Sequence, residues 1–91
     1  CVPIARKIIT SGLRYCPHYL GGGIGLLASA HALAAAGGDG LLEIDINENP
    51  LRSNLIGNLL SIKDGIASLG HGSGLGLSPD LEKINKYMVR Y

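Results

Sequence analysis

The chain has 91 residues, a length that allows one small domain with a modest hydrophobic core. Its net charge of +1 and its lack of Trp and Phe exclude a nucleic-acid surface made of a basic patch with aromatic platforms. No apolar run is long enough for a membrane span, and no stretch has the pattern of a signal peptide. We therefore expect neither nucleic acid nor membrane as a partner, and a cytoplasmic location.

The proportion of apolar residues is high for so short a chain. Hydrophobic residues make up 46% of the sequence and charged residues 16%, against the roughly one quarter that is usual for charged residues. This leaves too little polar surface to coat a small particle. We therefore expect some apolar faces to contact another part of the same fold or another subunit. The two cysteines, Cys1 and Cys16, have no metal-site spacing and are expected to be free thiols.

The first half of the chain alternates between helical and strand patterns, which is typical of βα units. The expected elements, in chain order, are a helix over 3–11 that stops at Gly12, a strand over Leu13–Cys16, a glycine-rich turn over 21–25, a helix over Leu26–Ala36 that stops at Gly37 and Gly38, and a strand over Leu41–Ile46. The second strand begins with apolar residues, as expected for a strand that is buried on both faces.

The second half has a different pattern. After a loop over 47–50, residues 51–58 are expected to be irregular or briefly helical. Asp64 and Gly65 predict a type I′ hairpin between 59–63 and 66–69, and a flexible glycine-rich stretch over 70–76 follows. The last element is expected to be a helix that has Ser78 as its N-cap and docks through one apolar face. That face is made of Leu81, Ile84 and Met88.

Two ionisable residues occupy the positions at which α/β enzymes keep their catalysts. His18 directly follows the first expected strand, and Glu43 lies within the second. An imidazole can take a proton from carbon near neutral pH, and a carboxyl group kept neutral by burial can donate one. A lone histidine after a strand is more often an ordinary loop residue. A glutamate in an apolar strand is harder to dismiss, because burying an unpaired carboxylate is costly.

The glycine turn allows a second interpretation. Residues 23–28 match G-x-G-x-x-A, and Glu43 lies twenty residues after Gly23, as in a dinucleotide-binding fingerprint. Against this, Pro17 and several further residues separate the strand from the first glycine of the motif. We therefore rank a dinucleotide-binding Rossmann domain second, and a non-catalytic interaction domain is a further alternative.

The remaining histidines and acids predict less. His31 is interpreted as a histidine that packs within the Ala/Leu-rich helix, and His71 as a solvated residue of the glycine-rich stretch. Asp45, Asn47 and Glu48 could suggest a metal loop, but their spacing lacks the ligand pattern of a calcium loop. Glu48 is expected to be solvated, and the role of Asp45 stays open.

Taken in order, these segments resemble one enzyme family. Cys16-Pro17-His18, the helix with residues 30–35, and Leu41-Leu42-Glu43 resemble the seventh and eighth barrel strands of the mandelate racemase/muconate lactonizing branch of the enolase superfamily. The tail resembles that family's C-terminal extension. The tail residues concerned are Asn49-Pro50-Leu51-Arg52, Lys63-Asp64-Gly65, Gly74-Leu75-Gly76, Asp80 and Tyr87.

The resemblance implies an α/β fold, namely the C-terminal portion of a (β/α) TIM-type barrel. Residues 1–46 would be its last βα units, and residues 47–91 an extension of a hairpin and a terminal helix that packs on a capping domain. The two expected strands would then be parallel neighbours, with His18 and Glu43 projecting from one edge. Two βα units cannot close a barrel of eight strands, which takes about 250 residues.

The implied function is a magnesium-dependent enzyme that abstracts the proton α to a carboxylate, such as a racemase or dehydratase of hydroxy or sugar acids. His18 would be the base or acid, and Glu43 would hydrogen-bond the carboxylate of a small substrate. The metal ligands and the second base would precede Cys1. We therefore expect the isolated chain to be inactive and to self-associate, unless the missing N-terminal part or another subunit covers it.

Overall fold

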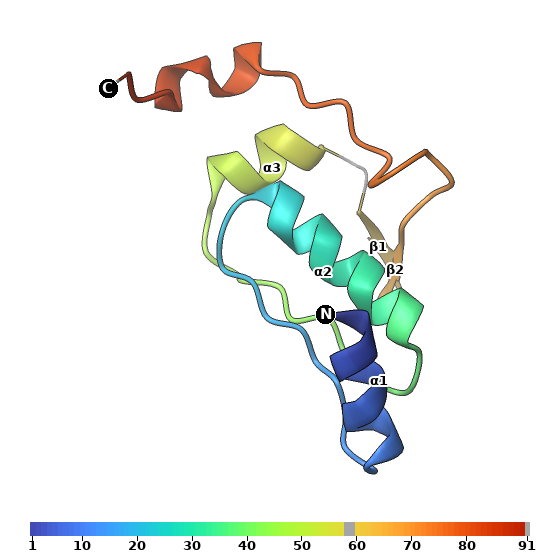
Figure 1. The fold of residues 1–91 in the computed structure, drawn as a ribbon. Helices are drawn as coiled ribbons and strands as arrows, with labels where there is room; N and C mark the ends of the chain where they lie inside the picture. Colours follow the sequence, from blue (N-terminus) through green and yellow to red (C-terminus); the bar gives the residue numbers. More distant parts are fainter. Residues whose placement is uncertain (58–59, 91) are drawn as a thin grey trace.

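The computed structural model describes residues 1–57 and 60–90, which form a helical body with a small hairpin (Figure 1). The elements are α1 (Val2–Thr10), α2 (Gly23–Ala36), α3 (Pro50–Ile56), β1 (Ser61–Lys63), β2 (Ile66–Ser68) and the 3₁₀ helix η1 (Glu82–Tyr87). Helix α2 lies at the centre and contacts both α1 and α3, and η1 contacts α3. Within the described residues, no helix is long and apolar enough to cross a membrane.

Helix α1 ends as the sequence predicts, at Gly12. The Gly12 N–H donates to the Ile9 carbonyl at 3.0 Å and the Leu13 N–H donates to the Ile8 carbonyl at 3.3 Å. This is the Schellman pattern, which requires a left-handed residue, and Gly12 has φ +78°. The turn reverses the chain so that the following segment runs back along the molecule.

Helix α2 begins three residues earlier than predicted, at Gly23 instead of Leu26. Of the glycines that were expected to form a turn, Gly23 and Gly25 belong to the first helical turn and Gly22 is its N-cap. A Cβ atom on Gly23 would lie 2.5 Å from the Arg52 carbonyl oxygen and 2.6 Å from Ile56 Cγ2. The helix ends as predicted, with Gly37 at φ +79°.

The core lies between α2 and α3. Leu26, Leu27 and Ile56 form its buried cluster, and Leu27 is completely inaccessible. Partly buried leucines surround this cluster, namely Leu42, Leu55, Leu60, Leu69, Leu75 and Leu77. The core is aliphatic and small, as the composition predicts.

The predicted strands Leu13–Cys16 and Leu41–Ile46 are not regular strands, so this prediction is wrong. The two segments do lie side by side in parallel, between α1 and α2 and between α2 and α3 (Figure 1). Among the described residues, a single backbone hydrogen bond joins them, from the Glu43 N–H to the Pro17 carbonyl at 3.2 Å. A parallel ladder needs a series of such bonds and is normally covered on both faces. Here Leu13 and Leu41 are exposed, so neither segment has that cover.

In the second half of the chain, the predicted hairpin is confirmed, and the segment expected to be irregular or briefly helical is a helix. Residues 50–56 are the helix α3, and Asn49 is its N-cap, accepting the Arg52 N–H on Oδ1 at 3.2 Å. Strands β1 and β2 pair in antiparallel register with Ile62 opposite Ala67. The turn residues Asp64 and Gly65 both have positive φ, as a type I′ turn requires. Asn58 and Leu59, which belong to the predicted segments 51–58 and 59–63, lie outside the described residues.

The terminal helix differs from its prediction. It is a 3₁₀ helix whose N-cap is Leu81, so Ser78 is not the N-cap. The physical reason is the Asp80 carboxylate, whose Oδ1 accepts the Glu82 N–H at 3.1 Å and so sets the first turn later in the chain. The predicted face is only partly docked: Leu81, Ile84 and Met88 line an apolar cavity of about 160 Å³ with Leu51 of α3, but Leu81 and Met88 remain 62% and 59% exposed.

This first turn is expected to weaken in acid. A hydrogen bond from Lys83, whose Nζ lies 3.3 Å from Oδ2, lowers the pKa of Asp80 below its ordinary value of 3.8. A carboxyl group with a depressed folded-state pKa contributes stability above its unfolded pKa, and that contribution is lost as the pH falls through the folded pKa. The Glu82 and Lys83 amide signals in NMR spectra should therefore shift below about pH 3.8. Asp80→Asn is the control, and a persistent acid transition in that variant would contradict the assignment.

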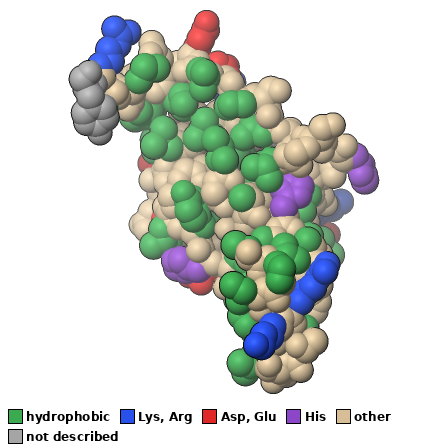
Figure 2. All heavy atoms as spheres, in the orientation of Figure 1, with side chains coloured by type: hydrophobic (Ala, Val, Ile, Leu, Met, Phe, Trp, Pro, Cys, Tyr) green, Lys and Arg blue, Asp and Glu red, His purple; other side chains and the backbone are tan. Residues whose placement is uncertain are grey.

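The molecule leaves much apolar surface uncovered. Its accessible area is 6702 Å², whereas the general scaling for monomeric proteins of 9.5 kDa gives about 5,000 Å². Its radius of gyration is 14.4 Å, compared with about 12 Å for a compact chain of this length. Figure 2 shows hydrophobic side chains gathered on the upper part of one face. The chain is therefore less compact than a self-sufficient domain of its size.

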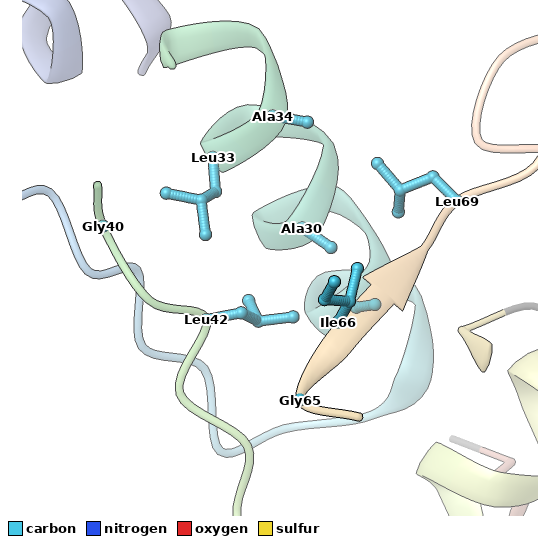
Figure 3. Close-up of a pocket in the computed structure, with 9 residues that line it drawn as sticks. Ala30, Leu33, Ala34, Gly40, Leu42, Gly65, Ile66 and Leu69 are labelled. Carbon is cyan, nitrogen blue, oxygen red and sulfur yellow. The ribbon is translucent and has the colours of Figure 1, made fainter. Parts of the chain in front are cut away.

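One cavity of about 270 Å³ lies between α2, the segment that follows α2, and the hairpin (Figure 3). Its wall is aliphatic, with Ala30 and Leu33 from the helix, Leu42 from the segment, and Ile66 and Leu69 from the hairpin region. Neither His18 nor Glu43 lines it, so the cavity is a gap in packing and not part of the site described next.

Candidate active site

The structure brings His18 and Glu43 together. The distance from His18 Nδ1 to Glu43 Oε1 is 2.8 Å, within hydrogen-bonding range. The two residues come from the parallel segments on either side of α2. Twenty-five positions separate them in sequence, so α2 and its connections create the contact.

Three contacts hold the two segments in register. The Leu41 N–H donates to Cys16 Sγ at 3.4 Å, and the Glu43 N–H donates to the Pro17 carbonyl at 3.2 Å. Between Tyr15 and Gly40 the backbones approach so closely that a Cβ on Gly40 would overlap the Tyr15 carbonyl oxygen. These contacts advance together along both segments, which makes the arrangement parallel and places His18 beside Glu43.

The pair is half exposed, which corrects one expectation. The side chain of Glu43 is 59% accessible and that of His18 is 49% accessible. Glu43 is therefore not a buried carboxyl group, and it is not unpaired. Because water screens such a pair, it contributes only about 0–1 kcal/mol to folding. Its significance lies in orienting the imidazole.

The chemistry of the pair follows from its donors and acceptors. An ionised carboxylate can only accept, so the proton in the contact belongs to His18 Nδ1. The neutral imidazole then has its free lone pair on Nε2, the atom that can take a proton from a substrate. A carboxylate that fixes the tautomer and orientation of a histidine is a recurrent device in general-base catalysis.

Sequence reasoning assigned no role near the pair to Asn49, which entered only through the family resemblance of the tail. Its Nδ2 donates to the Gly21 carbonyl, in the loop after His18, at 3.2 Å. The Asn-Pro pair before a helix is a recognisable N-cap signal, so the capping role was detectable from the sequence. The contact with Gly21, twenty-eight residues away, was not.

The other ionisable residues lie apart from the pair. His31 is half-buried in α2, and its Nε2 is buried without a hydrogen-bond partner among the described residues. His71 and Glu48 are exposed, as expected. Asp45 Oδ1 accepts two hydrogen bonds from Asn47, which makes it a loop-stabilising residue. Both cysteines are free and exposed.

The described residues do not form a metal site of their own. No group of three or more His, Cys, Asp or Glu side chains is placed to hold an ion in the part of the chain that the structure describes. Of the acidic groups in this segment, Glu43 is paired with His18 and Asp45 accepts hydrogen bonds from Asn47. A hard cation such as Mg²⁺ requires oxygen ligands arranged around it, which this arrangement does not supply.

The glycines of the G-x-G-x-x-A motif are occupied by packing. Gly23 faces Arg52 and Ile56, and a Cβ on Gly25 would overlap the ring of Tyr19. In a dinucleotide fold, these positions must stay open so that a pyrophosphate can approach the backbone. Glu43, the expected ribose ligand, is bound to His18 instead. The geometry does not favour the dinucleotide alternative.

Comparison with known proteins gives one match. The family model described as enolase C-terminal domain-like matches residues 1–84, nearly the whole chain. No curated protein and no solved structure matches the chain.

Proposed function

The chain belongs to the enolase C-terminal domain-like family, and on that premise we propose that His18 and Glu43 move a proton at the carbon α to a carboxylate. The observation that supports this proposal best is the 2.8 Å contact between His18 Nδ1 and Glu43 Oε1. It joins the two residues that the family resemblance assigns to catalysis. The substrate class is a small hydroxy or sugar acid, and racemases and dehydratases share this proton-transfer step.

In the proposed mechanism His18 transfers the proton, and Glu43 has two roles, one for each of its carboxyl oxygens. His18 accepts the α-proton on Nε2, or returns one, while Glu43 holds the ring through Nδ1. When protonated, Glu43 donates a hydrogen bond to the substrate carboxylate through its second oxygen, Oε2. The half-exposed position of the pair leaves it open to a substrate.

Enolase superfamily members generally use Mg²⁺. When bound, such an ion supplies positive charge that stabilises the enediolate formed by proton loss. Because the described residues do not fit a magnesium site, no step here is assigned to the metal. We propose that its ligands, and a second base, come from outside residues 1–91.

The uncovered surface supports a larger assembly. Leu13, Leu41 and Ile46 are 64%, 66% and 96% exposed, and all three belong to the parallel segments that carry the site. Burying such side chains is favourable by about 25 cal/mol per Å² of apolar area. We propose that the remaining elements of a (β/α) barrel cover these side chains, and that η1 and the hairpin pack on a capping domain.

The isolated chain is expected to be inactive. Incubated in D₂O with Mg²⁺ and candidate 2-hydroxy or sugar acids, it should exchange no α-proton above the uncatalysed rate, because residues 1–57 and 60–90 form no metal site. Exposed apolar side chains should also make it self-associate in sedimentation experiments.

The positive arm of this experiment uses a longer polypeptide that includes residues upstream of Cys1. That protein should exchange the α-proton in the presence of Mg²⁺ and lose this activity with EDTA. A monodisperse, active monomer of 91 residues would refute the assembly proposal. An inactive longer protein, tested over the whole substrate class, would refute the proposed chemistry.

A further inference from the structure

We propose that Asn49 is a positioning residue for the His18–Glu43 pair, with its side-chain amide fastening the loop that carries His18 to the start of α3. This inference rests on the proposed function, since it concerns the pair to which that function is assigned. It follows from the hydrogen bonds of one half-buried side chain and from the glycine content of the loop that this side chain contacts.

The loop that carries His18 is attached at both ends to the segment that carries Glu43. On the N-terminal side, the Pro17 carbonyl accepts the Glu43 N–H at 3.2 Å. On the C-terminal side, the Gly21 carbonyl accepts from Asn49 Nδ2 at 3.2 Å. His18 therefore lies within a five-residue span whose two ends are bonded to the segment over 43–49.

Asn49 is suited to this role because its side-chain oxygen and its side-chain nitrogen each make a hydrogen bond. Its Oδ1 accepts the Arg52 N–H at 3.2 Å and caps α3, while its Nδ2 reaches Gly21. Both hydrogen bonds are partly buried, so water competes with them less than at an exposed site. The cap fixes the side chain relative to α3, and the fixed side chain holds the loop.

The loop needs such a fastening because its own residues give it little stiffness. After His18 it continues through Tyr19 and Leu20, both exposed, to Gly21 and Gly22. Glycine has the largest backbone freedom to lose on ordering, and fixing each residue costs about 1–2 kcal/mol of entropy. Tyr19 helps by laying its ring over Gly21, where no Cβ would fit. The Asn49 bond is the polar contact that closes this span.

The capping and the fastening roles are separable by substitution. Asn49→Asp keeps an oxygen acceptor for the Arg52 N–H, and Asp is as good an N-cap as Asn, but the donor to Gly21 is lost. Ser53→Ala is the matched control, because it removes the bond from Ser53 Oγ to the Asn49 carbonyl at 3.3 Å and leaves the loop contact intact. Asn49→Ala removes both roles.

The readout is NMR of the 91-residue chain in alkaline buffer, where the imidazole is neutral. The His18 ring nitrogens report which tautomer is present, and circular dichroism reports helix content. The unsubstituted chain and Ser53→Ala should show the Nδ1–H tautomer and slow exchange of the Asn49 side-chain amide protons. Asn49→Asp should keep its helix content but lose the tautomer preference, a signal that a merely capping residue would not change.

The possible failures are distinguishable. If Asn49→Asp retains the ring signals of the unsubstituted chain, Asn49 does not position the pair and the inference is overturned, while the proposed function stands. If the unsubstituted chain shows no preference for Nδ1–H, the pair itself is absent, which overturns the proposed function and this inference together. Loss of the preference in Ser53→Ala as well would show a general effect of α3 and would also overturn it.

Discussion

Gly40→Ala is expected to destabilise the chain by about 3 kcal/mol or more, at the upper end of the range for overpacking. The added Cβ would overlap the carbonyl oxygen of Tyr15 and lie 3.0 Å from Leu33 Cδ1. Because the first of these is a backbone atom, no rotamer change can relieve the overlap. The two parallel segments must separate, and the Glu43–Pro17 hydrogen bond and the His18–Glu43 contact should be lost with them.

Urea unfolding followed by circular dichroism measures the stability, and the His18 ring nitrogens in NMR spectra report the pair. Gly22→Ala is the matched control. Gly22 has φ −70°, which alanine adopts readily, and its added Cβ would meet Leu51 at ordinary distances of 3.4 Å and 3.5 Å. That variant should stay within about 1 kcal/mol of the original chain. Equal stability of the two variants would show that the segments do not approach closely at Gly40.

His18→Asn is expected to lower α-proton exchange by about 10²–10⁴-fold in the assembled, magnesium-containing protein, the contribution usual for one general base. Asparagine retains a side-chain amide that can bond to Glu43 but cannot take a proton from carbon. Folding should be almost unchanged, because the half-exposed pair contributes about 0–1 kcal/mol. The exchange rate is followed by the loss of the α-proton NMR signal in D₂O.

Two further variants make this measurement specific. His71→Asn is the same substitution at an exposed histidine of the glycine-rich stretch, and it should leave the rate unchanged. Glu43→Gln keeps an acceptor for His18 Nδ1 but removes the negative charge, so we expect a smaller rate loss than in His18→Asn. A rate in His18→Asn equal to that in His71→Asn would eliminate His18 as the base.

The helix ends and the hairpin could be predicted from the sequence because local stereochemistry decides them. Gly12 and Gly37 end their helices since each must adopt a positive φ that other residues disfavour. Asp64 and Gly65 form the hairpin turn for the same reason. His18 and Glu43 were named as candidates from a family resemblance, and the match over residues 1–84 shows the family but assigns no role to either residue.

Other features depended on atoms that are far apart in sequence, and only the tertiary structure decided them. Helix α2 starts at Gly23, where Ile56 packs so closely against the backbone that only a residue without a side chain fits. Residues 13–16 and 41–46 have the sequence pattern of strands, but a parallel ladder also needs neighbouring strands and cover on both faces. The accessible area of 6702 Å², against about 5,000 Å² expected for this mass, shows that such cover is missing. The 2.8 Å contact of His18 with Glu43 and the Asn49 bond to Gly21 arise from packing around α2, which no local pattern encodes.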